Sequence, residues 1–206
     1  TLERSGITGE ELPQFRKQLA DEYPAGEIRM NRELLRLLGY LNDPSIVPRI
    51  VEFLKSDAQQ LEKIQAALYA RFITSGWTPE QKLVVLGFYE QARKFEGGYS
   101  LKGYFNNVCK DFCANLTPRE RLIVLSYGVI QPANAYAVLA GLEQVDADVL
   151  AMLVELDKRL PENKSQEARA LQTAIIAVMG ESKNAQAMTY LREAFEKQPE
   201  RRTELA

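Results

Sequence analysis

The chain has 206 residues and none of them is histidine. Without an imidazole, these residues cannot form a Ser-His or Cys-His catalytic pair, a zinc site built on histidine, or a C-x-x-C-H haem attachment. Histidine is also the side chain most often used as a general acid or base, so its absence excludes much of enzyme chemistry. We therefore expect no catalytic residues, no metal site and no bound cofactor in this segment.

The sequence also lacks a surplus of either charge and a long apolar run. It carries 26 basic and 28 acidic residues, which gives a formal net charge of −2. Because proteins that bind nucleic acid normally carry a basic surplus, we expect no nucleic-acid partner. No run approaches the ~18 apolar residues that predict a membrane helix, so we expect no membrane span.

Cysteine is scarce, since the chain has only Cys109 and Cys113. From Leu101 to Cys113 the apolar positions follow one another at intervals of 3, 1, 3, 1, 3 and 1, the spacing of one buried helix face. This pattern places both cysteines in the buried stripe, where they would act as small hydrophobic residues. Two alternatives stay open: a strained disulfide between residues four apart on a helix, and a metal site that would need further ligands.

Apolar residues recur at helical spacing along almost the whole chain, and no stretch shows sustained strand alternation. The pattern predicts an all-α fold of about eleven helices joined by short turns. The first helix is expected near residues 9–21. The others are expected to start near residues 31, 44, 58, 79, 101, 118, 132, 147, 166 and 184.

Several helix starts are marked by capping residues. "TPEQ" at 78–81 and "TPRE" at 117–120 each combine a capping threonine, a proline at the first helical position, and Gln or Glu three residues after the cap. Ser100 is a further candidate for a helix N-cap, and Gly180 is a candidate for the left-handed residue that ends a helix. These signals set the predicted helix boundaries.

The predicted helices recur with a loose period. Comparable capping positions at 43, 78, 117, 146 and 184 lie 35, 39, 29 and 38 residues apart. This spacing is close to that of HEAT and armadillo helix pairs, whose apolar faces are buried by stacking on their neighbours. The interpretation we favour is a right-handed α-solenoid of HEAT/armadillo-like antiparallel helix pairs, and a generic helical bundle is the alternative.

The domain organisation expected from these patterns has two parts. Residues 1–30 would form an N-terminal helix and lead-in, and residues 31–206 would form the repeat domain. The final "PERRTELA" begins with a proline and helix-forming residues and stops within about two turns, without the polar capping repeat that closes a solenoid. We therefore expect the repeat domain to be truncated at its C-terminus.

Five residues are candidates for contact with a partner. Arg29, Arg32 and Arg36 are spaced three and four apart, so they would line one helix face. Trp77 and Tyr99 are predicted at turns, where they would be exposed. The alternatives are a solvated arginine stripe paired with glutamates at 27 and 33, and, for the aromatic-rich stretch from 77 to 112, a well-filled core instead of a ligand platform.

Four stretches together resemble a known family. They are "NRELLRLLGYLNDPSIVPRIVEFL" (31–54), "ALYARFITSGWTPEQ" (67–81), "FEGGYSLKGYFNNVCKDFCANLTPRE" (95–120) and "YLREAFEKQPERRTELA" (190–206). They are similar to the HEAT-like region of planctomycete-type multidomain proteins that also carry a c-type cytochrome domain and a dehydrogenase-like β-propeller. The resemblance implies an extracytoplasmic or periplasmic helical module with haem bound elsewhere in the parent chain. The cysteine pair is not part of that family's pattern.

Two functions from different classes follow as hypotheses. The first is a non-catalytic scaffold that positions neighbouring domains of its parent chain or binds a protein partner. The second is a HEAT-like enzyme of the DNA glycosylase kind that binds a ligand or nucleic acid. The net charge of −2 favours the scaffold, and a gel shift at low salt discriminates between the two.

Overall fold

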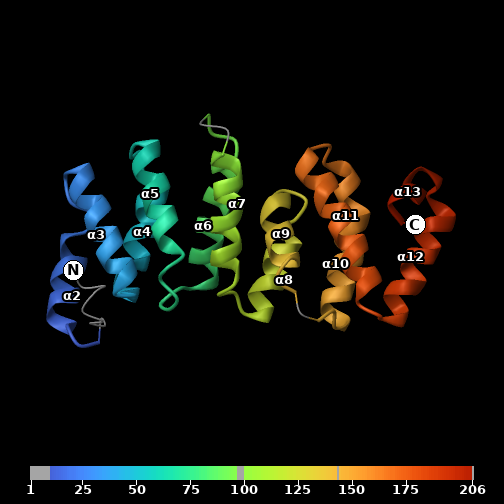
Figure 1. Cartoon of the computed structure of the whole chain (residues 1–206), viewed down its shortest axis with the longest axis horizontal. Coiled ribbons are helices and arrows are strands. Elements are labelled where there is room, and N and C mark those ends of the chain that lie inside the picture. The colour runs from blue at the N-terminus through green and yellow to red at the C-terminus, as the bar shows by residue number, and fades with distance from the viewer. Residues whose placement is uncertain (1–9, 97–99, 143, 206) are drawn as a thin grey trace. The chain divides into compact units, whose positions relative to one another are not determined.

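The structure is a computed structural model that describes residues 10–96, 100–142 and 144–205. Over these residues the fold is all-α, as the sequence predicts, and has no strand (Figure 1). No helix in the described part of the chain combines the length and the apolar character needed to cross a membrane.

Among the described residues, eleven α-helices have eight or more residues, and α13 is a short terminal helix. The α-helices are α2 (Pro13–Glu22), α3 (Ile28–Tyr40), α4 (Val47–Lys55), α5 (Gln60–Ala70), α6 (Pro79–Ala92), α7 (Leu101–Cys113), α8 (Pro118–Ser126), α9 (Pro132–Leu139), α10 (Ala147–Arg159), α11 (Gln166–Glu181), α12 (Ala185–Lys197) and α13 (Arg202–Leu205). Three 3₁₀ helices accompany them: η1 (Pro44–Ile46), η2 (Leu160–Glu162) and η3 (Pro199–Arg201). The largest differences from the predicted starts are at α2, which begins at 13 instead of 9, at α3, which begins at 28 instead of 31, and at α4, which begins at 47 because η1 occupies residues 44–46.

The caps explain why the other starts were predictable. Thr78 and Thr117 form the two predicted capping boxes, in which each threonine hydroxyl accepts from the backbone N–H three residues later at 3.3 Å. Ser100 stands at the predicted N-cap of α7, but its side chain makes no capping hydrogen bond. The prediction for Gly180 is wrong, because Gly180 lies inside α11. The positive backbone φ after α11 belongs to Lys183, at 56°.

The chain divides into two compact units, and we call the residues up to Asn115 unit 1 and those from Leu116 unit 2. In unit 1, α3 packs beside α2 and α5, α4 packs against α5 and α6, and α6 packs against α7. The predicted boundary between residues 30 and 31 lies within α3.

Helices α3 and α5 of unit 1 lie side by side and run in the same direction (Figure 1). Near their starts, Asn31 Nδ2 donates to Glu62 Oε1 at 3.4 Å, and beyond their ends Asn42 Nδ2 donates to Thr74 Oγ1 at 2.9 Å. These contacts join residues 31 and 32 positions apart in the sequence. Corresponding positions of α3 and α5 are therefore 31 or 32 residues apart, with α4 between the two helices in the sequence.

Unit 2 shows the same spacing. Its helix α9 packs beside α11, and α8 packs beside α10. Asn163 Nδ2 donates to the Val129 carbonyl and Tyr190 Oη donates to Asp157 Oδ2, both at 2.7 Å, across 34 and 33 positions. Each unit is thus compatible with stacked HEAT/armadillo-like helix pairs, and the right-handed solenoid stays a prediction.

The cores of the two units differ in composition. Large aromatic rings are buried in unit 1, where Tyr89 lies within 6.4 Å of Phe105 and 5.8 Å of Phe112, measured between ring centroids. The prediction that the aromatic-rich stretch is core is confirmed for these rings. The buried side chains of unit 2 are mainly aliphatic and include Leu125, Leu153, Leu160, Leu171, Ile175 and Met179.

Candidate interaction surface

Helix α3 presents three arginines to solvent on one face. Arg29, Arg32 and Arg36 are all exposed, and their spacing of three and four places them on adjacent turns. Tyr40 is 40% exposed and follows Arg36 by four residues, so it extends the same face. The opposite face of α3 is buried and carries Asn31, Leu34, Leu35 and Leu38.

Two glutamates of the same segment interact with this part of α3. Glu27 caps α3, because its Oε2 accepts from the Met30 backbone N–H at 2.8 Å. The backbone N–H groups of Arg29 and Met30 lower the pKa of Glu27, and the Arg29 charge adds to this effect. Arg36 donates to Glu33 Oε2 through Nε at 3.0 Å and Nη2 at 2.8 Å, which confirms the predicted pairing of the stripe with Glu33.

The end of α5 places an exposed aromatic ring beside this face. Phe72 is 47% exposed. A Cβ added at Gly39 would lie 3.5 Å from Phe72 Cβ and 3.7 Å from Tyr69 Cδ1, so the missing side chain lets α5 approach α3 closely. Phe72 therefore packs against α3 next to the position of Tyr40.

The guanidinium of Arg71 also contacts the Phe72 ring. Its guanidinium carbon lies 4.6 Å from the centroid of the Phe72 ring, and its Nη1 lies 3.6 Å from Asp111 Oδ2 on α7. A cation–π contact of this kind contributes about 0.5–1 kcal/mol at an exposed site. Phe72 is thus exposed and fixed in position, so a partner would order little of it on binding.

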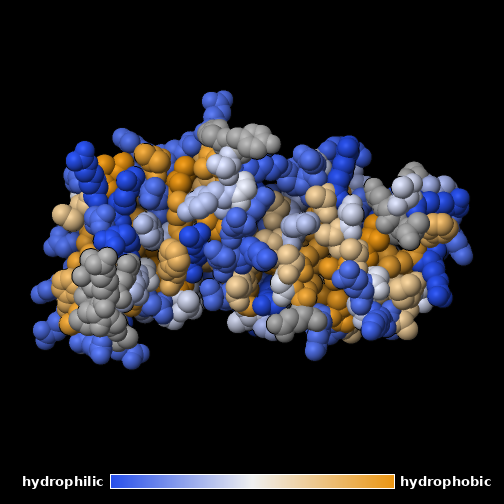
Figure 2. Space-filling model, in the orientation of Figure 1, coloured by the Kyte–Doolittle hydropathy of each residue, from blue (hydrophilic) through white to orange (hydrophobic). Residues whose placement is uncertain are grey.

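These residues define one surface, which we call the α3–α5 face. We also assign Leu61 to it, because it is 51% exposed and lies at the start of α5 beside Glu62, which accepts a hydrogen bond from Asn31 of α3. Figure 2 shows strongly hydrophilic and hydrophobic residues side by side over these helices. The members of the α3–α5 face are Arg29, Arg32, Arg36, Tyr40, Leu61 and Phe72.

Of the other two predicted contact residues, only Trp77 is among the described residues. Trp77 is only partly exposed, its ring packs edge-on against Phe112 at 5.4 Å, and its Nε1 donates to the Ile73 carbonyl at 2.7 Å. The indole therefore closes the edge of the unit 1 core and is not part of the α3–α5 face. Tyr99 lies outside the described residues.

The cysteines occupy the buried stripe that their spacing predicts. Cys109 is fully buried and Cys113 is 5% exposed, on the same face of α7. Their sulfur atoms lie 3.9 Å apart, so the pair is a dithiol and not a disulfide. The prediction that both cysteines lie in the core is confirmed.

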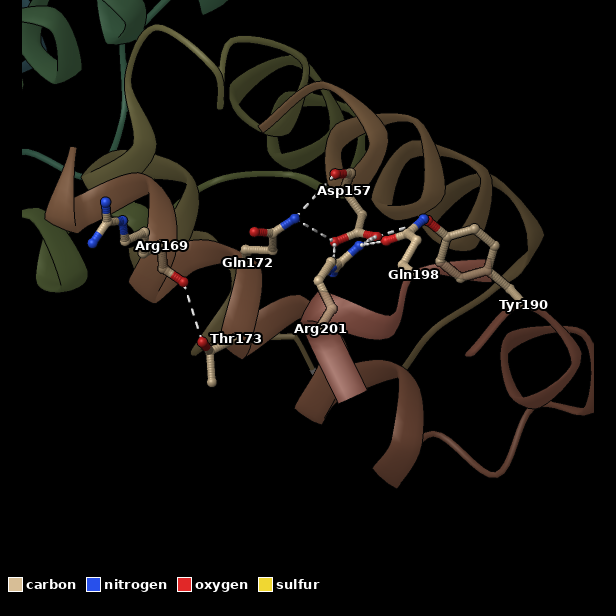
Figure 3. A network of polar contacts seen from close by, with 7 residues as sticks. All are labelled: Asp157, Arg169, Gln172, Thr173, Tyr190, Gln198 and Arg201. Atoms are coloured by element: carbon tan, nitrogen blue, oxygen red, sulfur yellow. Dashed lines mark hydrogen bonds and ion pairs between the residues drawn. The ribbon is translucent and has the colours of Figure 1, made fainter. Parts of the chain in front are cut away.

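Unit 2 contains a buried ionic network that no sequence pattern predicted (Figure 3). Asp157 is 1% exposed and receives two bonds from Arg201, Nη2 to Oδ1 at 2.8 Å and Nη1 to Oδ2 at 3.1 Å. Tyr190 Oη donates to Oδ2 at 2.7 Å, and Gln172 Nε2 donates to Oδ1 at 3.3 Å. Both carboxylate oxygens therefore accept hydrogen bonds.

This network joins four elements, because its members come from α10, α11, α12 and η3. Burial, followed by the hydrogen bond and charge of Asp157, raises the pKa of Tyr190, so the phenol stays a hydrogen-bond donor. Asp157 and Arg201 are 44 positions apart in the sequence, which is why no local motif indicated the pair. The acid and its partners bind each other, and these bonds hold η3 against α10, α11 and α12.

Metal-binding side chains and similar known proteins are the remaining indicators of function. Among the described residues, no group of three or more His, Cys, Asp or Glu side chains is placed to hold a metal ion. Comparison with protein-family models, curated proteins and solved structures finds no match for the chain. The fold alone shows the class of this protein. It is all-α over the described residues, and its units are compatible with helical repeats.

Proposed function

We propose that this chain is a non-catalytic helical-repeat module that binds a protein partner through the α3–α5 face. The observation that supports this proposal most is the gathering of exposed arginines and aromatic rings on one face of two packed helices. Arg and Tyr are over-represented among the residues that dominate binding energy in protein interfaces, and aromatic residues are enriched there generally.

The geometry of the face favours a defined contact over a diffuse one. Phe72 is packed against α3 at Gly39 and covered by the Arg71 guanidinium. A ring held in this way loses little conformational entropy when a partner covers it. Around it, the arginines supply charged hydrogen-bond donors that fix the orientation of a partner.

The charge of the face indicates the chemistry of the partner. Arg29, Arg32 and Arg36 carry three positive charges. Glu33 offsets one through its bond to Arg36, and Glu27 offsets part of another through its charge interaction with Arg29, so a positive surplus is left. The surface is therefore locally basic in a chain whose net charge is −2. The partner that this surface suits is an acidic polypeptide segment with large apolar residues for Phe72, Tyr40 and Leu61.

The wider context is proposed from the family resemblance alone. On that basis the chain is part of a larger extracytoplasmic protein associated with redox domains, and the acidic segment lies in a neighbouring domain or in a separate protein. The absence of a basic surplus argues against nucleic acid as the ligand, and we expect no gel shift at low salt.

Selection from a random displayed-peptide library tests this function without knowledge of the natural partner. Peptides retained by the intact chain should be rich in Asp and Glu and should contain large apolar residues. The R29E/R32E/R36E variant should bind the selected peptides at least about a hundredfold more weakly, because hot-spot arginines each contribute more than about 1 kcal/mol.

A matched variant controls for the change in net charge. Arg119, Arg169 and Arg192 are exposed arginines of unit 2, so R119E/R169E/R192E changes the chain charge equally and leaves the α3–α5 face intact. It should bind the selected peptides as the unaltered chain does. Peptides of neutral composition that bind all three proteins equally would rule out the α3–α5 face as the binding surface.

A further inference from the structure

The turn between α8 and α9 exposes large apolar side chains on unit 2. Ile130 is 74% exposed, and Tyr127, in the same turn, is 44% exposed. Tyr136, on α9, is 47% exposed. These are three of the four exposed large hydrophobic residues in the described part of unit 2, and the fourth is Phe195. Single exposed apolar residues are common on protein surfaces, whereas a group of them marks an interaction site.

The same part of the chain carries no charge. Residues 122–142 contain no Asp, Glu, Lys or Arg, and this run of 21 residues is nearly twice as long as the next, the 11 residues 170–180. Burial accounts for the inner positions of α9, but the exposed positions, which include Tyr127, Ile130 and Tyr136, are uncharged as well. Charged residues are depleted and Tyr is enriched at the centres of protein interfaces, so this surface has the composition of an interface centre.

Two contacts from other elements of unit 2 fix the turn in position. Asn163, which follows η2, donates from Nδ2 to the Val129 carbonyl at 2.7 Å. Gly128 lies so close to α10 that an added Cβ would stand 2.7 Å from Leu156 Cδ2. The turn therefore presents Ile130 from a fixed backbone, and a partner that covers this side chain orders little of the chain on binding.

We propose that the α8–α9 turn is the contact site for a second copy of this chain in a two-fold symmetric dimer. In such a contact both partners present the same patch, so the patch must be complementary to itself. A patch with a charge surplus repels its own copy, whereas an uncharged apolar patch does not. The neighbouring turn adds Glu162 and Lys164, which are exposed and opposite in sign, so the region stays neutral.

The other exposed apolar surfaces suit a second copy less well. The α3–α5 face carries the positive surplus of Arg29, Arg32 and Arg36, which would oppose an identical face. On α12, the guanidinium carbon of Arg202 lies 5.4 Å from the centroid of the Phe195 ring, so a cation already covers this ring. The dimer site therefore belongs to unit 2 and shares no residue with the α3–α5 face.

Sedimentation velocity of the whole chain tests the dimer. From about 1 µM to about 300 µM the unaltered chain should shift reversibly from monomer to dimer, because a small patch supports only a weak contact. I130D should raise the dissociation constant at least about a hundredfold, because the substitution is present in both copies and each should cost about tenfold or more. Its helix content by far-UV circular dichroism should not change, since Ile130 lies outside α8 and α9.

The same substitution in unit 1 is the matched control. Ile28 is 37% exposed and is the first residue of α3, where an acidic side chain is well accommodated. I28D should dimerise as the unaltered chain does. R29E/R32E/R36E should also dimerise normally, so the dimer site and the proposed function can fail independently.

Two results would overturn the dimer site. The first is a folded I130D variant that dimerises as tightly as I28D. The second is a chain that stays monomeric over the whole concentration range. If that monomer also floats with phosphatidylcholine vesicles and the I130D variant does not, the turn contacts a lipid surface and not a second copy.

Discussion

Both units are built from packed helices, but they bury different kinds of side chain. Unit 1 fills its centre with aromatic rings, among them Tyr89, Phe105 and Phe112. Unit 2 has an aliphatic centre and a buried carboxylate, Asp157, that is neutralised by Arg201. The first arrangement depends on the shapes of rings, and the second depends on one ion pair whose partners are 44 positions apart in the sequence.

This difference predicts how each unit responds to substitution. Removing one partner of a buried ion pair leaves an uncompensated charge, which costs more than the pair itself contributes. The ring cluster of unit 1 contains no charge that a substitution could leave unpaired. Loss of one polar partner of Asp157 should therefore destabilise unit 2 more than loss of one polar group from the ring cluster destabilises unit 1.

The largest expected effect is at the ion pair of unit 2. Arg201→Met should lower the free energy of unfolding of unit 2 by about 3–5 kcal/mol, because Asp157 stays buried without its cation. Amide hydrogen exchange of α10 and α12 measures this loss, since it resolves the two units. The double variant D157L/R201M should recover part of the stability, because it removes both charges.

Arg202 provides the matched control for that substitution. It is exposed, and its Nε donates to the Phe195 carbonyl at 3.1 Å. Arg202→Met should change the stability of unit 2 by less than about 1 kcal/mol. Equal losses for the two arginines would show that the Asp157 network does not hold unit 2 together.

The next effect compares one chemical change in both units. Tyr190→Phe removes a hydrogen bond to a carboxylate, which contributes about 1.5–3 kcal/mol, and Tyr89→Phe removes a bond to the Ala67 carbonyl, which contributes about 1 kcal/mol. Both bonds are 2.7 Å long, so the acceptor makes the difference. Urea unfolding monitored for each unit should rank Tyr190→Phe as the more harmful change, and the reverse order would contradict the comparison.

A smaller effect should be similar in both units. Thr78→Ala and Thr117→Ala each remove a capping box, at α6 in unit 1 and α8 in unit 2, and the Thr117 hydroxyl also donates to Glu120 Oε2 at 3.0 Å. Each should cost about 1 kcal/mol in the free energy of unfolding. Thermal unfolding of the two variants measures this, and a large difference between them would mean that caps depend on their unit and are not local.

The smallest effect depends on pH. Glu27 has its pKa lowered by the backbone N–H groups of Arg29 and Met30. A lowered pKa in the folded state stabilises the fold above the unfolded pKa of about 4.3, and this contribution is lost as pH falls through the folded value. The melting temperature of E27Q should therefore lie slightly below that of the unaltered chain at pH 7 and converge with it in acid. If the difference in melting temperature between E27Q and the unaltered chain persists at low pH, the ionisation of Glu27 is not its cause.

Local features were predictable from the sequence, and long-range contacts were not. The starts of α6 and α8 follow from capping residues within four positions, and the burial of Cys109 and Cys113 follows from one helical stripe. These signals are local because caps and stripes are complete within one element.

The candidate surface was predictable only in part. The spacing of Arg29, Arg32 and Arg36 places them on one face, but the position of Phe72 beside α3 depends on Gly39, which lies on another helix much earlier in the sequence. Trp77 was expected to be exposed, and its ring instead packs against Phe112 on α7. Such contacts are set by how helices stack, which periodicity within one helix does not specify.

The central claim is that the acidic partner binds to the α3–α5 face of unit 1 and not to unit 2. The most direct measurement is the dissociation constant of a selected acidic peptide for R29E/R32E/R36E and for R119E/R169E/R192E, side by side. Affinity should fall at least about a hundredfold for the first variant and should not fall for the second. Equal affinities, or a loss confined to the unit 2 variant, would contradict it.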